Sequence, residues 1–256
     1  MRHRQSPSVI SKRGSTMSKN HEAADDSRDF RNDQLRCEDA AWGYVSPGES
    51  RWPASVSVGG ALVLQLLLPD RLTIGPFWLI PAIEAFVLVT LIIVAPSHVN
   101  NRTRDARWLA LGLIAILILT NAITLGLLMH HLLHAGPDLN GRSLVFSAVA
   151  VWSTGVVAFG LSYWEIDRGG PTQRCSPLHP APDFMFPQME NPDVTEERWT
   201  PRFTDYLYVS LTNSTAFSPT DALPLTARAK AIMAVQSLTS LATIVVVGAR
   251  AVNILK

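Results

Sequence analysis

The stretch TPRFTDYLYVSLTNSTAFSPTD, residues 200–221, decides how the rest of this chain is interpreted. Thr200 is a suitable N-cap and Pro201 is favoured at the first helical position, so a helix is predicted to begin here. Between Asp205 and Asp221 the sequence has fifteen residues without a charge. Since a helix rises about 1.5 Å per residue, this run is too short to cross a bilayer. We therefore expect a re-entrant segment that dips into the membrane and returns.

Long uncharged stretches on both sides of this segment predict membrane-spanning helices. A hydrocarbon core about 30 Å thick requires about 20 apolar helical residues. We predict an all-α integral membrane protein with about five transmembrane helices, multi-pass in the cell membrane and surrounded by the lipid bilayer. Four spans plus one partial insertion is the alternative. The five predicted spans are residues 54–68, 77–95, 108–128, 144–164 and 231–247.

Charge and cysteine content exclude several other classes of protein. The 256 residues include 22 Lys and Arg and 21 Asp and Glu, for a net charge of +1, so no nucleic-acid partner is expected. Cys37 and Cys175 are too few for a disulfide framework, and neither has the spacing of a metal site. We expect no cofactor and no bound metal. Residues 1–50 are rich in both charge signs and poor in apolar side chains, which predicts a disordered polar tail.

Residues 207–230, LYVSLTNSTAFSPTDALPLTARAK, resemble the pore helix, selectivity filter and inner-helix start of potassium channels. That family has approximately the pattern LYxSxxTxTTVGYGDxxPxTxxGR. A similar degenerate pore loop is found in a set of bacterial multi-span membrane proteins, which this chain also resembles. The positions that match the channel pattern are Leu207, Tyr208, Ser210, Thr215, Asp221, Pro224 and Thr226, with Lys230 at the basic position.

The resemblance implies a division of the chain into two membrane regions. Residues 52–142 would hold the three N-terminal spans, and residues 143–256 would form a pore-like module. The predicted parts of this module are an outer helix at 143–164, a proline-rich loop at 165–200, a short re-entrant helix at 201–214, a filter-like loop at 215–221 and a last helix at 228–250. One chain supplies one pore loop, so the resemblance implies a homotetramer.

The filter-like loop departs from the potassium-channel pattern at the two glycine positions. In a potassium filter, backbone carbonyls replace the water around the ion, and glycines allow the required dihedral angles. Here those positions hold Ser218 and Thr220, and Pro219 between them has a fixed φ. We expect either a wider, hydrated path of low selectivity for monovalent cations or a packed, closed loop. The loop comprises Thr215, Ala216, Phe217, Ser218, Pro219, Thr220 and Asp221.

Two polar residues lie inside predicted spans. Glu84 and Asn121 are expected at similar depth in an antiparallel helix pair, so we predict that their side chains meet or nearly meet. A protonated Glu84 bound to Asn121 would hold the helices together, whereas an ionised Glu84 would serve as an ion or proton site. His130 and His134 share a helix face at the end of the third span, but no third metal ligand is apparent.

The leading functional prediction is an ion-channel-like pore, specifically a weakly selective cation channel. The alternative is a non-conducting structural or interaction protein of the membrane. A membrane enzyme using His179, Asp183 or Glu190 is a third hypothesis, but we predict that the protein is not an enzyme. Lys and Arg residues are more frequent beside the spans on the side of the N-terminus, which places that side in the cytoplasm. With five spans the pore-like loop then faces the cytoplasm, opposite to its place in potassium channels.

Overall fold

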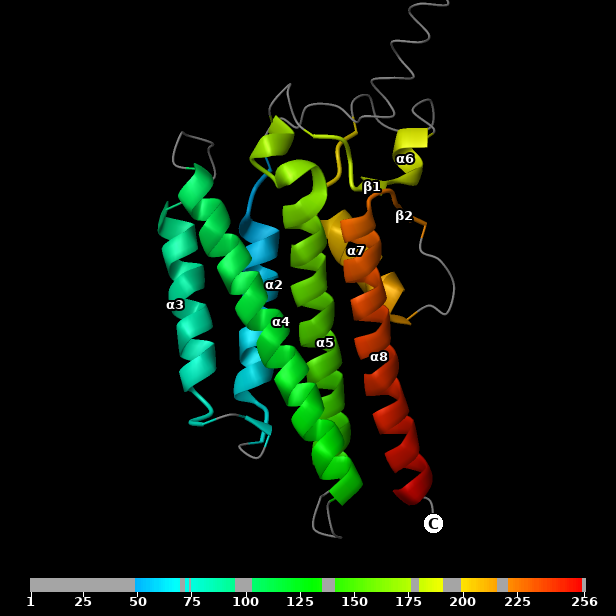
Figure 1. The fold of residues 1–256 in the computed structure, drawn as a ribbon. Helices are drawn as coiled ribbons and strands as arrows, with labels where there is room; N and C mark the ends of the chain where they lie inside the picture. Colours follow the sequence, from blue (N-terminus) through cyan, green and yellow to red (C-terminus); the bar gives the residue numbers. More distant parts are fainter. Residues whose placement is uncertain are drawn as a thin grey trace, which may run out of the picture.

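The computed structural model describes residues 49–69, 72–73, 75–94, 103–134, 141–175, 180–190, 199–215 and 221–254. This part of the chain is mostly helical, with one small antiparallel sheet of two strands (Figure 1). The predicted all-α class is therefore confirmed in its coarse form. The predicted tail up to residue 48 and the filter-like residues 216–220 lie outside the described residues.

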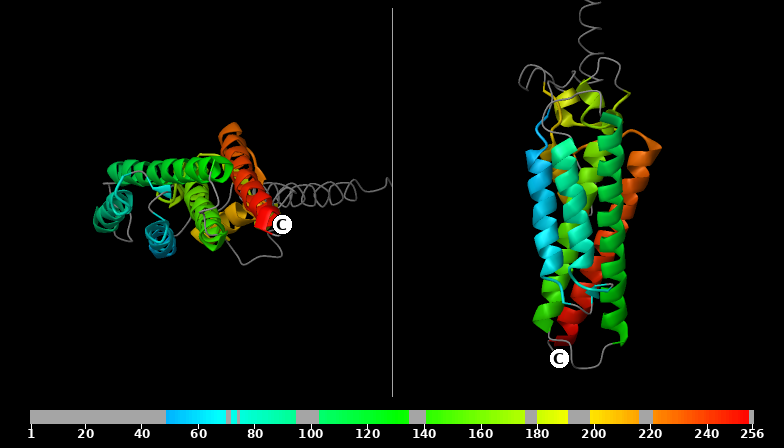
Figure 2. Two further views of the ribbon diagram at one scale, coloured as in Figure 1. Left: turned by 90° about the horizontal axis from the view of Figure 1, so that it is seen from below. Right: turned by 90° about the vertical axis from the view of Figure 1, so that its left-hand side faces the viewer.

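Five long helices run side by side along one axis (Figures 1 and 2). Their order along the chain is α2 (Trp52–Leu66), α3 (Leu79–Val94), α4 (Thr103–His134), α5 (Gly141–Ile166) and α8 (Ala227–Ile254). Each corresponds to a predicted span, with ends that differ by a few residues. Sequence breakers account for the ends: Pro53 lies in the first turn of α2, and the pair Gly136-Pro137 follows the end of α4.

Short elements follow α5 at one end of the bundle. They are the 3-10 turns η2 (Asp167–Gly169) and η3 (Gln173–Cys175), strand β1 (Phe184–Met185) and helix α6 (Pro187–Glu190). Helix α7 (Phe203–Thr215) then packs against α5 and α8, and strand β2 (Leu223–Pro224) precedes α8. The described parts of the proline-rich loop contain only short elements and no long helix, as its many prolines predict.

Two of the described helical segments are long and apolar enough to cross a membrane, Ala106–His131 and Ser143–Gly169. Helices Trp52–Leu66 and Leu79–Ile93 are apolar but shorter. This length and composition weakly support a membrane protein. The arrangement with five spans remains a prediction.

The apolar core joins helices from both predicted membrane regions. One cluster of buried side chains includes Val58 of α2, Leu113 of α4, Phe159 of α5, Tyr206 of α7 and Met233 of α8. The helices before and after residue 142 therefore pack as one body. The outer faces of the bundle also carry large apolar side chains, as expected where lipid or another chain covers them. The most exposed of these are Trp52, Val56, Phe86, Ile93, Trp108, Leu119 and Leu238.

Candidate functional site

Helix α7 is held at its first residue by an acidic side chain from far away in the sequence. The backbone N–H of Phe203 donates a hydrogen bond to Oε1 of Glu49, and Oδ2 of Asp205 accepts one from the N–H of Arg202 at 2.7 Å. Negative charge at a helix N-terminus is stabilising. The helix begins at Phe203, later than the predicted start with Thr200 as N-cap. Glu49, which was assigned to the polar tail, is part of the ordered structure.

Helix α7 begins at the same end of the bundle at which strand β2 and the start of α8 lie (Figure 1). After α7 and residues 216–220, β2 pairs antiparallel with β1, with Phe184 opposite Pro224 and Met185 opposite Leu223. The N–H of Leu225 donates to the carbonyl of Asp183 at 2.8 Å. Thr226 then caps α8, because its Oγ1 accepts a hydrogen bond from the N–H of Ala229 at 3.3 Å. Residues 216–220, which join α7 to β2, lie outside the described residues, so the re-entrant turn and its insertion into a membrane remain predictions.

A close backbone contact fixes α7 against α5. A Cβ added at Gly160 would lie 3.2 Å from the Cα atom of Leu207. This is tighter than ordinary van der Waals contact, so the missing side chain at Gly160 allows the two helices to approach. Small residues at helix crossings serve this purpose in membrane proteins.

Gln236 of α8 is the centre of a polar seam, which we define as the hydrogen-bonded polar side chains that join α5, α7 and α8. Its Nε2 donates to the carbonyl and hydroxyl of Ser210, at 2.9 and 2.6 Å, and to the hydroxyl of Ser214 at 2.7 Å. Its Oε1 accepts from the Tyr163 hydroxyl and from Asn213 Nδ2. All the polar atoms of the Gln236 side chain therefore have partners within one chain.

In the structure, Glu84 and Asn121 have different partners. Asn121 Nδ2 donates to the carbonyl of Val151 at 2.6 Å, while Gln65 and Thr120 are the polar side chains that interact with Glu84. The predicted hydrogen bond between Glu84 and Asn121 is wrong. Glu84 lies near Thr120, the residue directly before Asn121, so its predicted depth relative to α4 is nearly right. Consecutive helical residues point about 100° apart, so Asn121 faces another direction.

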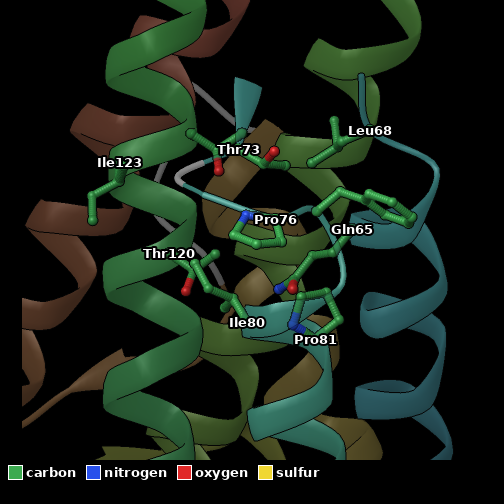
Figure 3. Close-up of a pocket in the computed structure, with 10 residues that line it drawn as sticks. Gln65, Leu68, Thr73, Pro76, Ile80, Pro81, Thr120 and Ile123 are labelled. Atoms are coloured by element: carbon green, nitrogen blue, oxygen red, sulfur yellow. The ribbon is translucent and has the colours of Figure 1, made fainter. Parts of the chain in front are cut away.

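A small cavity lies beside Gln65 and Thr120, between α2, α3 and α4 (Figure 3). Gln65 and Thr120 both line it, together with Thr73, Ile80 and Pro81. Neither carboxyl oxygen of Glu84 and neither polar atom of the Gln65 side chain has a hydrogen bond of acceptable geometry among the described residues.

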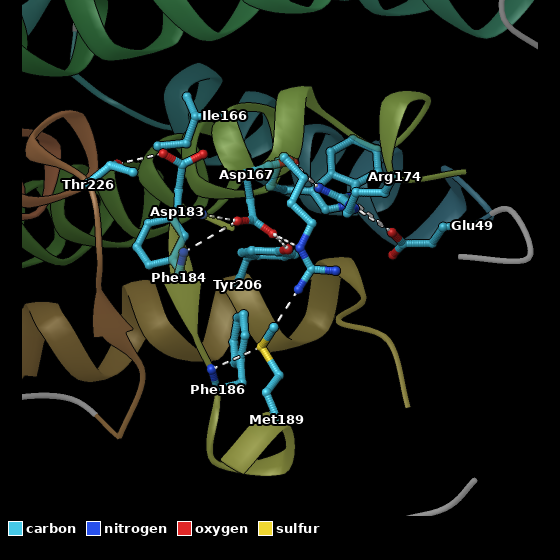
Figure 4. A network of polar contacts seen from close by, with 12 residues as sticks. Glu49, Ile166, Asp167, Arg174, Asp183, Phe184, Phe186, Met189, Tyr206 and Thr226 are labelled. Carbon is cyan, nitrogen blue, oxygen red and sulfur yellow. Dashed lines mark hydrogen bonds and ion pairs between the residues drawn. The ribbon is translucent and has the colours of Figure 1, made fainter. Parts of the chain in front are cut away.

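The other end of the bundle contains a buried polar network centred on Asp167 (Figure 4). Oδ1 of Asp167 accepts hydrogen bonds from the N–H groups of Asp183 and Phe184, at 2.7 and 3.3 Å, and Oδ2 accepts one from the Tyr206 hydroxyl at 2.5 Å. These contacts join the end of α5, strand β1 and helix α7. Asp167 thereby positions α7 relative to the loop that precedes it.

Two buried arginines provide the positive charge of this network. Arg174 donates to the carbonyl of Trp164 at 2.7 Å, forms an ion pair with Glu49 at 3.6 Å, and lies 5.3 Å from the centroid of the Tyr206 ring. Arg168 has a φ of 51° and lies 3.7 Å from the Asp167 carboxylate. The left-handed region is uncommon for a residue other than glycine, so the surrounding contacts must hold Arg168 there.

A third ion pair joins the loop to α8. The Arg228 guanidinium contacts both carboxyl oxygens of Asp183, and the Thr226 hydroxyl donates to one of them. Hydrogen bonding to Asp183 raises the pKa of Arg228, so this arginine stays charged throughout the physiological range. Asp183, one of the residues considered for catalysis, is thus occupied in a structural contact.

The remaining predicted site residues are placed only in part. Thr215 ends α7 and Asp221 precedes β2, and both side chains are exposed. Ala216, Phe217, Ser218, Pro219 and Thr220 lie outside the described residues, as does His179. Glu190 is exposed on α6. Within the described part of the chain, no group of three or more His, Cys, Asp or Glu side chains is placed to hold a metal ion.

No family model, curated protein or solved structure has a significant match to this chain. The resemblance to the pore segment of potassium channels therefore remains a prediction from the sequence motif.

The sequence interpretation missed the network around Asp167. One signal was present: Glu165, Asp167 and Arg168 directly follow a long uncharged run, where charged residues usually lie in water. In the structure all three are buried. Their distant partners, Asp183 and Tyr206, had no spacing that would reveal the contact.

Proposed function

We propose that this chain is a multi-pass membrane protein whose helices α5, α7 and α8 form a pore-like module, and that four copies assemble around a weakly selective path for monovalent cations. The observation that carries this proposal is the geometry of α7. It has only 13 residues, it packs between longer helices, and the chain returns to the end from which α7 began. If α7 enters the membrane, the non-helical backbone that follows it must be buried in protein or line a water-filled cavity.

The chemistry at the inner end of α7 supports a cation as the ion. The C-terminal end of a helix carries partial negative charge, which favours cations nearby. The hydroxyls of Thr212 and Thr215 donate to helix carbonyls, at 2.9 and 3.0 Å, which leaves their oxygen lone pairs free. The hydroxyl side chains of the following residues and the Asp221 carboxylate would extend this lining in the proposed pore.

The end of the bundle that contains the polar network would face the cytoplasm. Arg51, Arg107, Arg174, Arg202 and Arg228 all belong to elements at this end. An excess of arginine beside membrane spans favours the cytoplasmic side. In this orientation α7 would enter the membrane from the cytoplasm, opposite to the pore helix of potassium channels.

Ion flux from liposomes containing the purified full chain tests the proposal. The wild type is expected to release K⁺ and Na⁺ at comparable rates, and Thr215→Trp is expected to block both. Thr204→Trp is the matched control, because Thr204 is exposed at the opposite end of the same helix. The proposal fails if the wild type conducts no cation, or if Thr215→Trp and Thr204→Trp conduct equally.

A non-conducting structural or interaction protein is the second candidate function. The polar seam favours it, because Gln236 satisfies its hydrogen bonds within one chain and gives α7 a closed, packed junction. Chemical cross-linking in native membranes separates the two functions when combined with the flux measurement. Stable oligomers without flux would support this second function.

A further inference from the structure

A groove lies at the junction of α2, α3, α4 and α5, toward the end of the bundle that contains the polar network. Apolar side chains from all four helices line most of it, among them Val58, Leu88, Leu113 and Leu161. Leu91, which also lines the groove, is only half-buried, so the groove reaches the outer surface of the bundle. Its volume of about 30 Å³ has room for only part of an acyl chain, and the rest of such a chain would lie in the bilayer.

The lining of the groove is polar at the first turn of α2 and the last turn of α5. Its polar members are Arg51, Ser55 and Glu165. Arg107 lies beside this polar end, because Ala110, three residues later on the same face of α4, lines the groove. Nε of Arg107 is 4.0 Å from Oε1 of Glu165. An apolar groove thus ends beside two arginines and one carboxylate.

The charges at this end of the groove do not balance. Arg51 and Arg107 both interact electrostatically with Glu165, as does Arg174, but Arg174 forms an ion pair with Glu49. Arg51, Arg107 and Glu165 together therefore carry one positive charge. Nη1 of Arg51 is buried and has no hydrogen-bond partner among the described residues. Buried donors normally have an acceptor, so this nitrogen requires one from outside the described part of the chain.

Two exposed tryptophans place these arginines at the depth of lipid headgroups. Trp52 directly follows Arg51 and Trp108 directly follows Arg107, and they have 69% and 66% of their surfaces exposed. Tryptophan is enriched where the membrane meets water. In the orientation proposed above, this end of the bundle faces the cytoplasmic leaflet, which contains anionic lipids.

We propose that the groove binds one anionic phospholipid, with its phosphate between Arg51 and Arg107 and part of one acyl chain against α2, α3 and α4. The single charge of a phosphodiester balances the positive charge of the three groups, and its oxygens are acceptors for Nη1 of Arg51. Oε2 of Glu165 also has no hydrogen-bond partner among the described residues, so a headgroup with hydroxyl donors fits best. The proposal rests on the membrane location and orientation proposed above, but not on ion conduction.

Equilibrium binding of radioactively labelled phosphatidylglycerol to the purified full chain in dodecyl maltoside micelles tests this site. The wild type is expected to bind one phosphatidylglycerol per chain saturably, and at least about five-fold more tightly than phosphatidylethanolamine with the same acyl chains. Arg51→Gln and Arg107→Gln are each expected to weaken phosphatidylglycerol binding about five-fold. Arg202→Gln removes an exposed arginine that does not line the groove, so this control is expected to bind as the wild type does.

A second pair of variants tests the apolar part of the groove, even if the arginine variants do not fold. Leu91→Trp fills the groove from its half-buried edge and is expected to weaken phosphatidylglycerol binding. Ile92→Trp alters the exposed neighbour outside the lining and is expected to bind as the wild type does. Thr215→Trp is expected to keep full lipid binding, so loss of ion flux and loss of this site can be told apart.

Four results would overturn the proposal. The first is the absence of saturable phosphatidylglycerol binding in the folded wild type, and the second is equally tight binding of the two lipids. The third is unchanged binding in the folded variants Arg51→Gln, Arg107→Gln and Leu91→Trp. The fourth is displacement of the bound lipid by millimolar inorganic phosphate, which would indicate a site for free anions only.

Discussion

Replacing Asp167 with alanine should release α7 from the loop that precedes it. Asp167 is completely buried and accepts hydrogen bonds from the N–H groups of Asp183 and Phe184 and from the Tyr206 hydroxyl, and it pairs with Arg168. Breaking a buried ion pair by removing one partner costs about 3–5 kcal/mol of the free energy of unfolding. We expect Asp167→Ala to fall in that range, because it leaves three hydrogen-bond donors without an acceptor and the buried Arg168 without its ion-pair partner.

Tyr206→Phe isolates one of these contacts. It removes a single hydroxyl that donates to the Asp167 carboxylate at 2.5 Å, so we expect a loss of about 1.5–3 kcal/mol. In the Asp167→Ala background the same change should cost close to nothing, because the hydroxyl has already lost its acceptor. The double-mutant cycle should therefore give a coupling energy of about 1.5–3 kcal/mol.

Unfolding of the purified protein in detergent micelles, followed by far-ultraviolet circular dichroism, measures these differences. Glu190→Ala is the control, since this carboxylate is exposed on α6, and we expect a change within about 0.5 kcal/mol. The role assigned to Asp167 is refuted if its replacement costs less than about 1 kcal/mol or if the effects of the two substitutions simply add.

Three other substitutions probe the contacts that hold α7 and its surroundings. Gln236→Leu should reduce stability by about 2–4 kcal/mol in the same unfolding assay, because it leaves the buried polar partners in α7 unpaired. Gly160→Ala should be less stable than Gly59→Ala by about 1–3 kcal/mol, since only the added Cβ at Gly160 meets a backbone atom of α7, at 3.2 Å. Gly170→Ala should destabilise by about 1–3 kcal/mol, because Gly170 has a φ of +95° and the new Cβ would lie 3.0 Å from Oε1 of Glu165. If Gln236→Leu or Gly170→Ala is as stable as the wild type, the role given to that residue is wrong. If Gly160→Ala and Gly59→Ala are equally stable, the close contact at Gly160 does not limit the packing of α7.

The residues of the resemblance show why a motif is an incomplete guide to contacts. Ser210 and Thr226 match the channel pattern, and both have specific roles: Ser210 bonds to α5 and α8, and Thr226 caps the last helix. Tyr208, which also matches, has 56% of its surface exposed. A match to the motif therefore does not tell which of these residues are buried, because burial depends on which neighbouring helix covers each position.

The positions of the helices could be predicted from the sequence. Apolar runs without charges, with prolines and glycines at their ends, determine where α2, α3, α4, α5 and α8 form, because these signals act within a few residues of one another. The same local reasoning predicted a separate short helix before Asp221. Its start was misplaced by two residues because Glu49, more than a hundred positions earlier, supplies the negative charge at the helix N-terminus.

Which side chains meet was decided only by the tertiary structure. Glu84 lies near Gln65 and Thr120, whereas Asn121 bonds to α5, because a rotation of one helical position redirects a side chain by about 100°. Asp167 finds its partners only after the loop folds back against α5 and α7. Charged side chains directly after an apolar run normally lie in water. The local sequence around Asp167 does not show that a distant loop will cover this side chain.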